Sequence, residues 1–132
     1  MFNNLIVKYK GYLYLLFRLI AGALFFQHGA QKILGWFGGQ SSVLFSSIWF
    51  FGLFEFIGGL AIFLGLFTRL AAFGAVILML IAYFKVHMPQ GIIPIINNGE
   101  LALLYIAAFL ILIAYGSKKN SLEKLIFKKE IF

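Results

Sequence analysis

Apolar residues dominate four long stretches of the chain, and short polar or glycine-rich segments separate them. The stretches cover residues 12–34, 43–66, 69–87 and 99–115. A helix rises about 1.5 Å per residue, so about 20 apolar residues cross the hydrocarbon core of a bilayer, which is about 30 Å thick. The pattern therefore predicts an all-α integral membrane protein, a four-helix bundle over residues 1–116.

Residues that cap or stop helices stand at the ends of these stretches. Ser41 or Ser42 is suited to begin the second span, and Thr68 is suited to begin the third. Pro89 is expected to end the third span, because proline lacks the N–H that continues a helix. These signals set the expected boundaries.

The last segment, residues 117–132, differs from the rest because apolar residues alternate with lysines. Leu122, Leu125, Ile126 and Phe127 would form one face of a short helix. Such a pattern is typical of an amphipathic helix that lies on a membrane surface. We therefore expect a basic, amphipathic, interfacial tail that follows the transmembrane domain.

The composition supports the membrane class. Of the 132 residues, 63% are hydrophobic and only 11% are charged, and the mean hydropathy is +1.00. Soluble domains average roughly 45–50% apolar and about 25% charged residues. The chain has no cysteine, which excludes thiol–disulfide relays, thiolate zinc sites and iron–sulfur ligation within it.

The positive charge is concentrated near the C-terminus. The net charge is +7, and five lysines lie within the last fifteen residues: Lys118, Lys119, Lys124, Lys128 and Lys129. Beside a membrane span, this clustering indicates contact with anionic lipid, and we expect no nucleic-acid partner. By the positive-inside rule, both termini of this multi-pass protein should be cytoplasmic.

Two charged residues fall far from the ends of the predicted spans, Arg18 in the first and Glu55 in the second. From the expected span ends, their depths differ by about 6–7 Å, which an arginine side chain can bridge. An unpaired charge is far more costly in lipid than a paired one. We therefore predict an intramembrane ion pair between Arg18 and Glu55, serving either to orient the helices or to handle a proton or ligand.

A second polar group gathers at the predicted outer ends of the spans. Its members are Gln27, His28, Gln31, Lys32, Lys85, His87 and Glu100. Taken singly, each has a structural explanation: a lysine can extend to the lipid headgroups, and an acid in the first turn of a helix interacts favourably with the helix dipole. Together, at one membrane level, they predict a ligand pocket.

The two histidines raise the question of haem, because a bundle can hold it between histidines on different helices. Two histidines are few, and only Lys32 and Lys85 would meet the propionates. We expect neither haem nor another metal, and quinone stays a possible ligand.

Several short runs together resemble the DoxX family of small bacterial membrane proteins. They are Leu16-Phe17-Arg18-Leu19, His28-Gly29-Ala30-Gln31-Lys32, Gly35-Trp36-Phe37-Gly38-Gly39, Glu55-Phe56-Ile57-Gly58-Gly59, Gly65-Leu66-Phe67-Thr68-Arg69, His87, Asn98-Gly99-Glu100 and Ser121-Leu122-Glu123. The resemblance implies four transmembrane helices in the bacterial inner membrane and, in some members, association with quinone-linked or other redox enzymes. Most members have no established activity.

Three functions remain open, and the sequence does not decide whether the protein is an enzyme. The first is a redox-associated subunit that binds a quinone or similar amphiphile near the outer face and works with a redox-enzyme partner. Histidine and glutamine suit quinone carbonyls as hydrogen-bond donors. The second is a scaffold or assembly subunit without chemistry, and the third is a small-molecule carrier. Small residues at helix-packing spacing indicate a homo-oligomer.

Overall fold

The chain folds into helices only, over the part that the computed structural model describes, residues 1–131. In chain order they are α1 (Phe2–Leu34), α2 (Ser47–Leu64), α3 (Thr68–Ala82), η1 (Tyr83–His87), η2 (Met88–Gln90), α4 (Pro94–Asn97), α5 (Glu100–Tyr115) and α6 (Leu122–Phe127). The segment η1 is a π-helix and η2 a 3₁₀-helix, and both continue α3. The predicted all-α class is confirmed.

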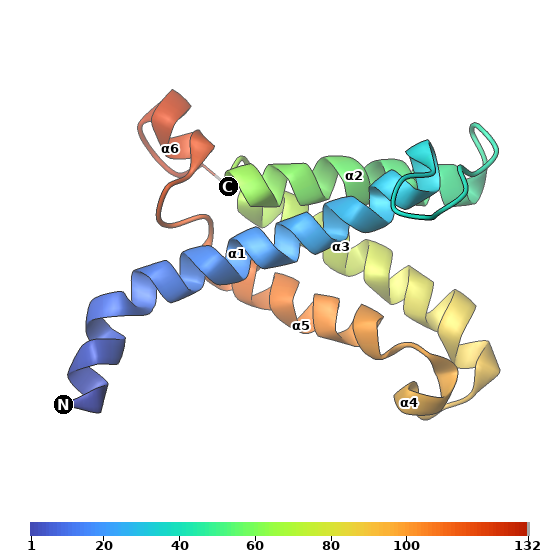
Figure 1. Ribbon diagram of the computed structural model, residues 1–132, viewed down its shortest axis with the longest axis horizontal. Helices are drawn as coiled ribbons and strands as arrows, with labels where there is room; N and C mark the ends of the chain where they lie inside the picture. Colours follow the sequence, from blue (N-terminus) through green and yellow to red (C-terminus); the bar gives the residue numbers. More distant parts are fainter. Residues whose placement is uncertain (132) are drawn as a thin grey trace.

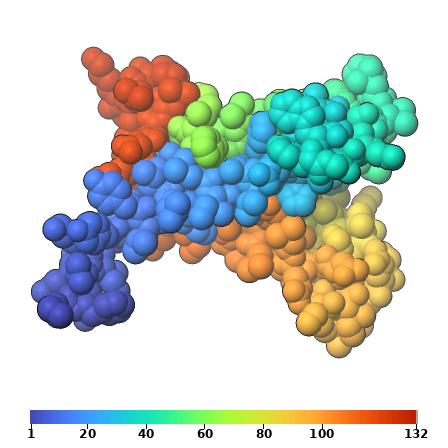
Figure 2. Space-filling view, in the orientation of Figure 1, coloured from blue at the N-terminus to red at the C-terminus, as the bar shows by residue number. Residues whose placement is uncertain are grey.

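The long helices pack as two pairs. Helix α1 lies along α2, and α3 lies along α5, while α2 and α3 join the pairs (Figure 1). The first turns of α1 and the C-terminal segment project at one end of the molecule. The connection after α1 and the segment around α4 form two lobes at the other end (Figure 2).

Glycines allow α1 and α2 to approach backbone to backbone. A Cβ atom added at Gly22 would lie 2.5 Å from the Phe63 nitrogen, and one at Gly29 would collide with the Phe56 nitrogen. Gly59 of α2 makes the reciprocal approach to α1. Small residues at a helix–helix contact are the usual means of close packing in membranes.

Aromatic rings fill the space between the two helix pairs. Phe25 of α1 stands edge-on to Phe109 and Tyr105 of α5, with ring centroids 4.8 and 5.3 Å apart. Phe25 and Phe109 are fully buried. This cluster fixes α1 against α5 at the level where the polar side chains of the site begin.

Three segments are long and apolar enough to cross a membrane: Phe2–Leu34, Ser47–Leu64 and Thr68–Gln90. Helix α5 is also apolar, but it has 16 residues and is shorter than the other three. Its crossing, and with it the four-span topology, stays a prediction.

The helix boundaries differ from the predicted ones in four places. Helix α1 begins at Phe2, so the basic lead is helical as well. Ser46, and neither of the earlier serines, caps α2 by accepting a hydrogen bond from the Trp49 nitrogen. Thr68 lies inside α3, and Pro89 does not stop the helical path, because its missing N–H falls in the first turn of a new 3₁₀ segment.

The tail folds back against the bundle. Ser117, Ser121 and Glu123 are buried, and the Glu123 nitrogen donates to the Gly65 carbonyl at 3.1 Å. The expected amphipathic helix is limited to the six residues of α6, of which Leu125 is well exposed. Phe132, the last residue of the predicted tail, lies outside the described residues.

Candidate functional site

An ion pair joins α1 to α2, but its members are Lys32 and Glu55. The Lys32 Nζ lies 2.7 Å from both carboxylate oxygens of Glu55. The side chain of Glu55 is 3% exposed and that of Lys32 is 33% exposed. The acid is therefore buried, and its cation reaches it from the edge of the bundle.

The predicted pair of Arg18 with Glu55 is wrong because the helix register differs from the expected one. Gly29 faces Phe56 and Gly22 faces Phe63, so Glu55 lies level with Ala30. Positions 18 and 30 of α1 are twelve residues, or about 18 Å, apart along the helix axis. No arginine side chain spans that distance.

Arg18 is instead buried among backbone carbonyls. Its guanidinium donates to the carbonyls of Ser117, Lys119 and Asn120 at 2.6–3.0 Å and to that of Phe63 at 3.4 Å. Three of these acceptors belong to the segment that follows α5. Arg18 therefore fastens the C-terminal segment to α1, and it takes no part in the polar cavity described next.

The predicted pocket exists in altered form as a cavity of about 210 Å³ between α1, α2, α3 and α5. It lies in the half of the bundle remote from α6. Its lining residues are His28, Lys32, Glu55, Met79, Ala82, His87, Asn98, Leu101, Ala102 and Tyr105. Three of the predicted pocket residues, His28, Lys32 and His87, are thus brought together, and Glu55 joins them.

Of the other four predicted residues, Lys85 is exposed in η1, and the remaining three lie elsewhere in the molecule. Gln31 donates to the carbonyl of Phe37 at 3.2 Å and so holds the connection after α1. Gln27 lines a separate, mostly apolar cavity with Phe26 and Phe63. Glu100 is exposed in the first turn of α5, where an acid suits the helix dipole. The structure therefore does not bring Gln27, Gln31 and Glu100 into the cavity.

Hydrogen bonds fix the proton position on His87. Its Nδ1 lies 3.1 Å from the carbonyl oxygen of Asn97. A carbonyl only accepts, so Nδ1 carries the proton and Nε2 of the neutral ring is left as an acceptor. The side chain of Asn97 is itself held by Gly91 and Gly99, which makes this orientation of the imidazole rigid.

Tyr105 was not predicted, although it is one of the residues that line the cavity. Its ring stacks on Phe109 and stands edge-on to His28. Its hydroxyl is buried and has no hydrogen-bond partner within residues 1–131. A buried hydroxyl without a partner is costly. The available signal was a single tyrosine in the middle of an otherwise apolar helix.

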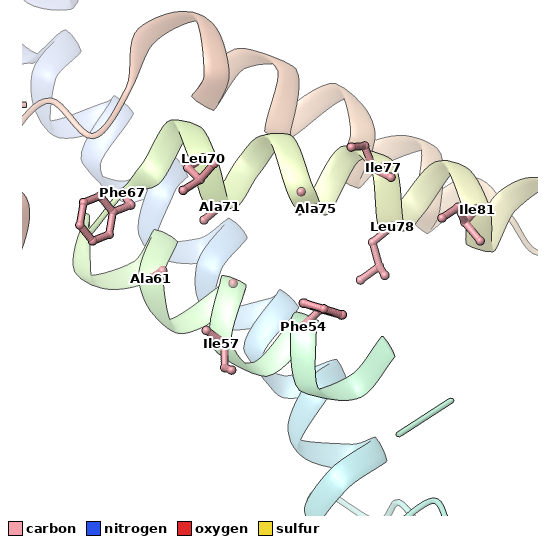
Figure 3. A pocket seen from close by; sticks show the side chains of 12 residues that line it. Phe54, Ile57, Ala61, Phe67, Leu70, Ala71, Ala75, Ile77, Leu78 and Ile81 are labelled. Atoms are coloured by element: carbon pink, nitrogen blue, oxygen red, sulfur yellow. The ribbon is translucent and has the colours of Figure 1, made fainter. Parts of the chain in front are cut away.

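A cavity larger than the polar one is lined by apolar residues alone. It is a groove of about 640 Å³ between α2 and α3, where Phe54 and Leu78 point toward each other (Figure 3). Its lining is apolar throughout. Consecutive residues on α2 line the groove and the polar cavity, Phe54 and Glu55, so the two spaces lie on different faces of the same helix.

No cluster of three or more His, Cys, Asp or Glu side chains that could hold a metal ion occurs in the described part of the chain.

These features define a helical membrane protein with a small polar cavity between its helix pairs. A family model named DoxX matches residues 13–88, which is more than half of the chain. The chain therefore belongs to the DoxX family. The matched region includes Arg18, His28, Lys32, Glu55 and His87, but it ends before the cavity residues of α5.

Two proteins of Haemophilus influenzae are similar in sequence, and both are described only as uncharacterized. One is 37% identical over 134 residues, which cover 96% of this chain and 99% of the relative. The other is 38% identical over 64 residues, which cover 48% of this chain and 42% of the relative. No solved structure matches the chain.

Proposed function

We propose that the protein is a redox-associated membrane subunit that binds the headgroup of a quinone-like amphiphile in the polar cavity. One observation carries the proposal: Tyr105 lines a cavity that two histidines share, and its buried hydroxyl lacks a hydrogen-bond partner among the described residues. A ligand atom that accepts a hydrogen bond would satisfy this hydroxyl. Ligand sites typically combine apolar walls with a few such polar groups.

The donors and acceptors of the cavity suit a headgroup that changes between quinone and quinol. A quinone carbonyl accepts, as Tyr105 requires, and a quinol hydroxyl donates, as His87 Nε2 requires. His28 and the Lys32–Glu55 pair add groups that can hold or release a proton. The two electrons would come from a redox enzyme bound to this subunit, as the family resemblance suggests.

The groove between α2 and α3 suits the apolar tail of the same molecule. It is about three times larger than the polar cavity and apolar along its length. A headgroup beside Glu55 and a tail beside Phe54 would place each part of an amphiphile against matching chemistry.

The test is direct binding to the purified protein in lipid nanodiscs. Ubiquinone-1 is titrated and its retention is read by native mass spectrometry, which also reports any oligomer. Tyr105→Phe should weaken binding about fivefold, because it removes one hydrogen bond and no ring. Tyr12→Phe, at the other end of the bundle, is the matched control. If no quinone binds, or if both variants bind quinone equally well, the quinone proposal fails and the scaffold function is favoured instead.

The orientation in the membrane belongs to the same proposal. Lys8 and Lys10 belong to the first turns of α1, Arg69 to the first turn of α3 and most tail lysines to the segment around α6, and these elements lie at one end of the bundle (Figure 1). We propose that this end is cytoplasmic. The polar cavity then lies nearer the outer face of the inner membrane. A C-terminal alkaline phosphatase fusion that is active would reverse this assignment.

A further inference from the structure

A second amphiphilic cavity lies at the opposite end of the bundle, between α1 and α5. Its volume is about 380 Å³, and its lining residues are Lys10, Gly11, Tyr14, Ile111, Tyr115 and Lys118. The proposed quinone site shares none of these residues. The two cavities are therefore separate, and each must have its own occupant.

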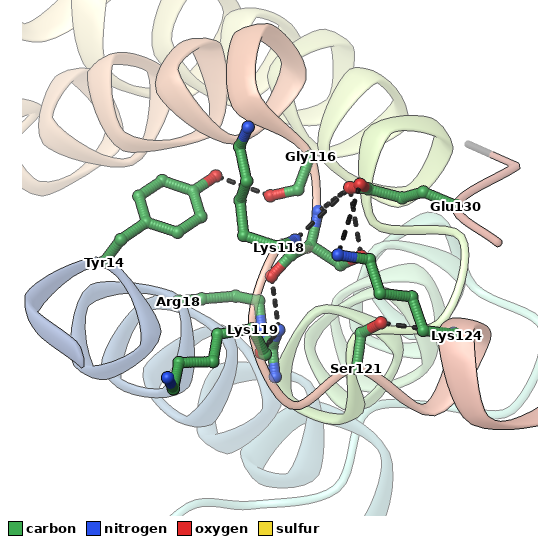
Figure 4. Close-up of polar contacts among 9 residues, drawn as sticks. Tyr14, Arg18, Gly116, Lys118, Lys119, Ser121, Lys124 and Glu130 are labelled. Atoms are coloured by element: carbon green, nitrogen blue, oxygen red, sulfur yellow. Dashed lines mark hydrogen bonds and ion pairs between the residues drawn. The ribbon is translucent and has the colours of Figure 1, made fainter. Parts of the chain in front are cut away.

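Two lysines from opposite ends of the chain meet at this cavity. Neither Lys10 nor Lys118 forms an ion pair among the described residues, where the acids of the two salt bridges are Glu55 and Glu130. Glu130 contacts Lys118 only through its backbone nitrogen, and the Lys118 side chain points away from that acid (Figure 4). The cavity is thus positively charged without internal compensation.

The walls beside the lysines are apolar and held in place. The Tyr14 hydroxyl donates a hydrogen bond to the Gly116 carbonyl at 2.6 Å. The Tyr14 ring packs edge-to-face against Tyr115, with ring centroids 6.1 Å apart. The Lys118 Nζ lies 6.0 Å from the centroid of Tyr115. Ile111, half exposed, continues the apolar surface along α5. The occupant must therefore join an anionic head to an apolar chain.

From this combination we infer that the cavity binds an anionic phospholipid, with its phosphate between Lys10 and Lys118 and an acyl chain along Ile111. Basic pockets between transmembrane helices on the cytoplasmic side are suited to anionic headgroups. The charge distribution of the chain agrees, because most of its excess lysines lie at this end. The bound lipid would add to the contacts of Tyr14 that already join the start of α1 to the end of α5.

The experiment compares phosphatidylglycerol with phosphatidylcholine of identical acyl chains, added to the detergent-purified protein and read by native mass spectrometry. Lys10→Gln/Lys118→Gln should reduce the preference for phosphatidylglycerol by about tenfold or more, since each lysine near an anionic headgroup contributes about fivefold. The matched control, Lys8→Gln/Lys129→Gln, removes the same charge at the same end but lines no cavity, and should change the preference by less than about threefold.

Two further arms distinguish a bound lipid from misfolding of the variant and from a plain anion site. Lys10→Arg/Lys118→Arg should retain the preference, which shows that the loss in the glutamine variant is not misfolding. Inorganic phosphate at millimolar concentration should not displace the lipid. Equal losses in the cavity and control variants would overturn the inference, because the attraction would then be diffuse. Displacement by free phosphate would overturn it as well, by identifying a site for any small anion.

Discussion

At the scale of single residues, the buried acid Glu55 is the most constrained group of the proposed site. Its carboxylate is nearly inaccessible and is bonded through both oxygens to Lys32. Removing one member of a buried pair leaves an uncompensated charge, which costs about 3–5 kcal/mol. The two members are not equivalent, because Lys32 is one-third exposed and Glu55 is not.

We therefore predict that Lys32→Met destabilises the protein more than Glu55→Gln does. Lys32→Met should lower the free energy of unfolding by about 3–5 kcal/mol, because it leaves the Glu55 carboxylate buried without a cation. Glu55→Gln should cost less, because Lys32 can then turn its ammonium toward water. The measurement is thermal unfolding in nanodiscs. The exchanged double variant Lys32→Glu/Glu55→Lys should recover part of the loss, whereas Lys85→Met should have little effect. Additive losses in the double variant would show that the pair contributes nothing.

Residue patterns predicted only part of this chemistry. His28, Lys32 and His87 were identifiable because polar side chains are rare and expensive within apolar spans. The partners of Arg18 were not, because they are backbone carbonyls, which every residue carries. Tyr105 was missed since tyrosine is common in membrane helices, and only the packed structure shows that its hydroxyl is buried without a partner among the described residues.

At the scale of elements, glycine sets the contact between α1 and α2. Gly29 faces the backbone of Phe56, whereas Gly74 of α3 has nothing within 4 Å of a Cβ. The same glycine-to-alanine change should therefore have opposite effects at these two positions. The elements themselves were predictable from hydropathy, but the register between them was not, because it depends on where these glycines meet.

We predict that Gly29→Ala destabilises the bundle by about 1–3 kcal/mol, since a backbone cannot yield as a side chain can. Gly74→Ala should be neutral or stabilise by up to about 1 kcal/mol, because alanine favours the helix and meets no neighbour. Unfolding in nanodiscs compares the two variants. A similar loss at both positions would argue that helix propensity, and not the α1–α2 contact, decides the effect.

At the scale of the whole molecule, the C-terminal segment connects parts that are distant in sequence. Arg18 of α1 donates hydrogen bonds to carbonyls of this segment. Glu130, near its end, folds back and accepts hydrogen bonds from the backbone nitrogens of Ser117 and Lys118 at 2.5 and 3.3 Å (Figure 4). Lys124 lies 3.9 Å from the same carboxylate. Composition predicted a basic amphipathic tail, but it did not predict this return. The backbone N–H groups that bind Glu130 and the carbonyls that bind Arg18 become available only after α5 has ended at Gly116.

The return of the tail should depend on pH through Glu130. Burial raises the pKa of Glu130, but hydrogen bonds from Lys118 and Ser117 and the charge of Lys124 outweigh it, so its pKa lies below the ordinary value of 4.5. A carboxyl with a lowered folded pKa stabilises the docked tail above its unfolded pKa, and this contribution is lost as pH falls through the folded value. Docking should therefore be pH-independent near neutrality and weaken below about pH 4.5.

Hydrogen exchange of residues 117–131, measured between about pH 6 and pH 3 and corrected for intrinsic rates, checks this expectation. Protection should fall toward the acid end in the natural chain. Glu130→Gln keeps the shape of the side chain but cannot ionise, so its protection should be lower at pH 6 and should lose less on acidification. Glu123, buried in the same segment, is unchanged in both proteins and so cannot cause a difference between them. If the two proteins lose protection in parallel, the acid response arises elsewhere and Glu130 does not hold the tail.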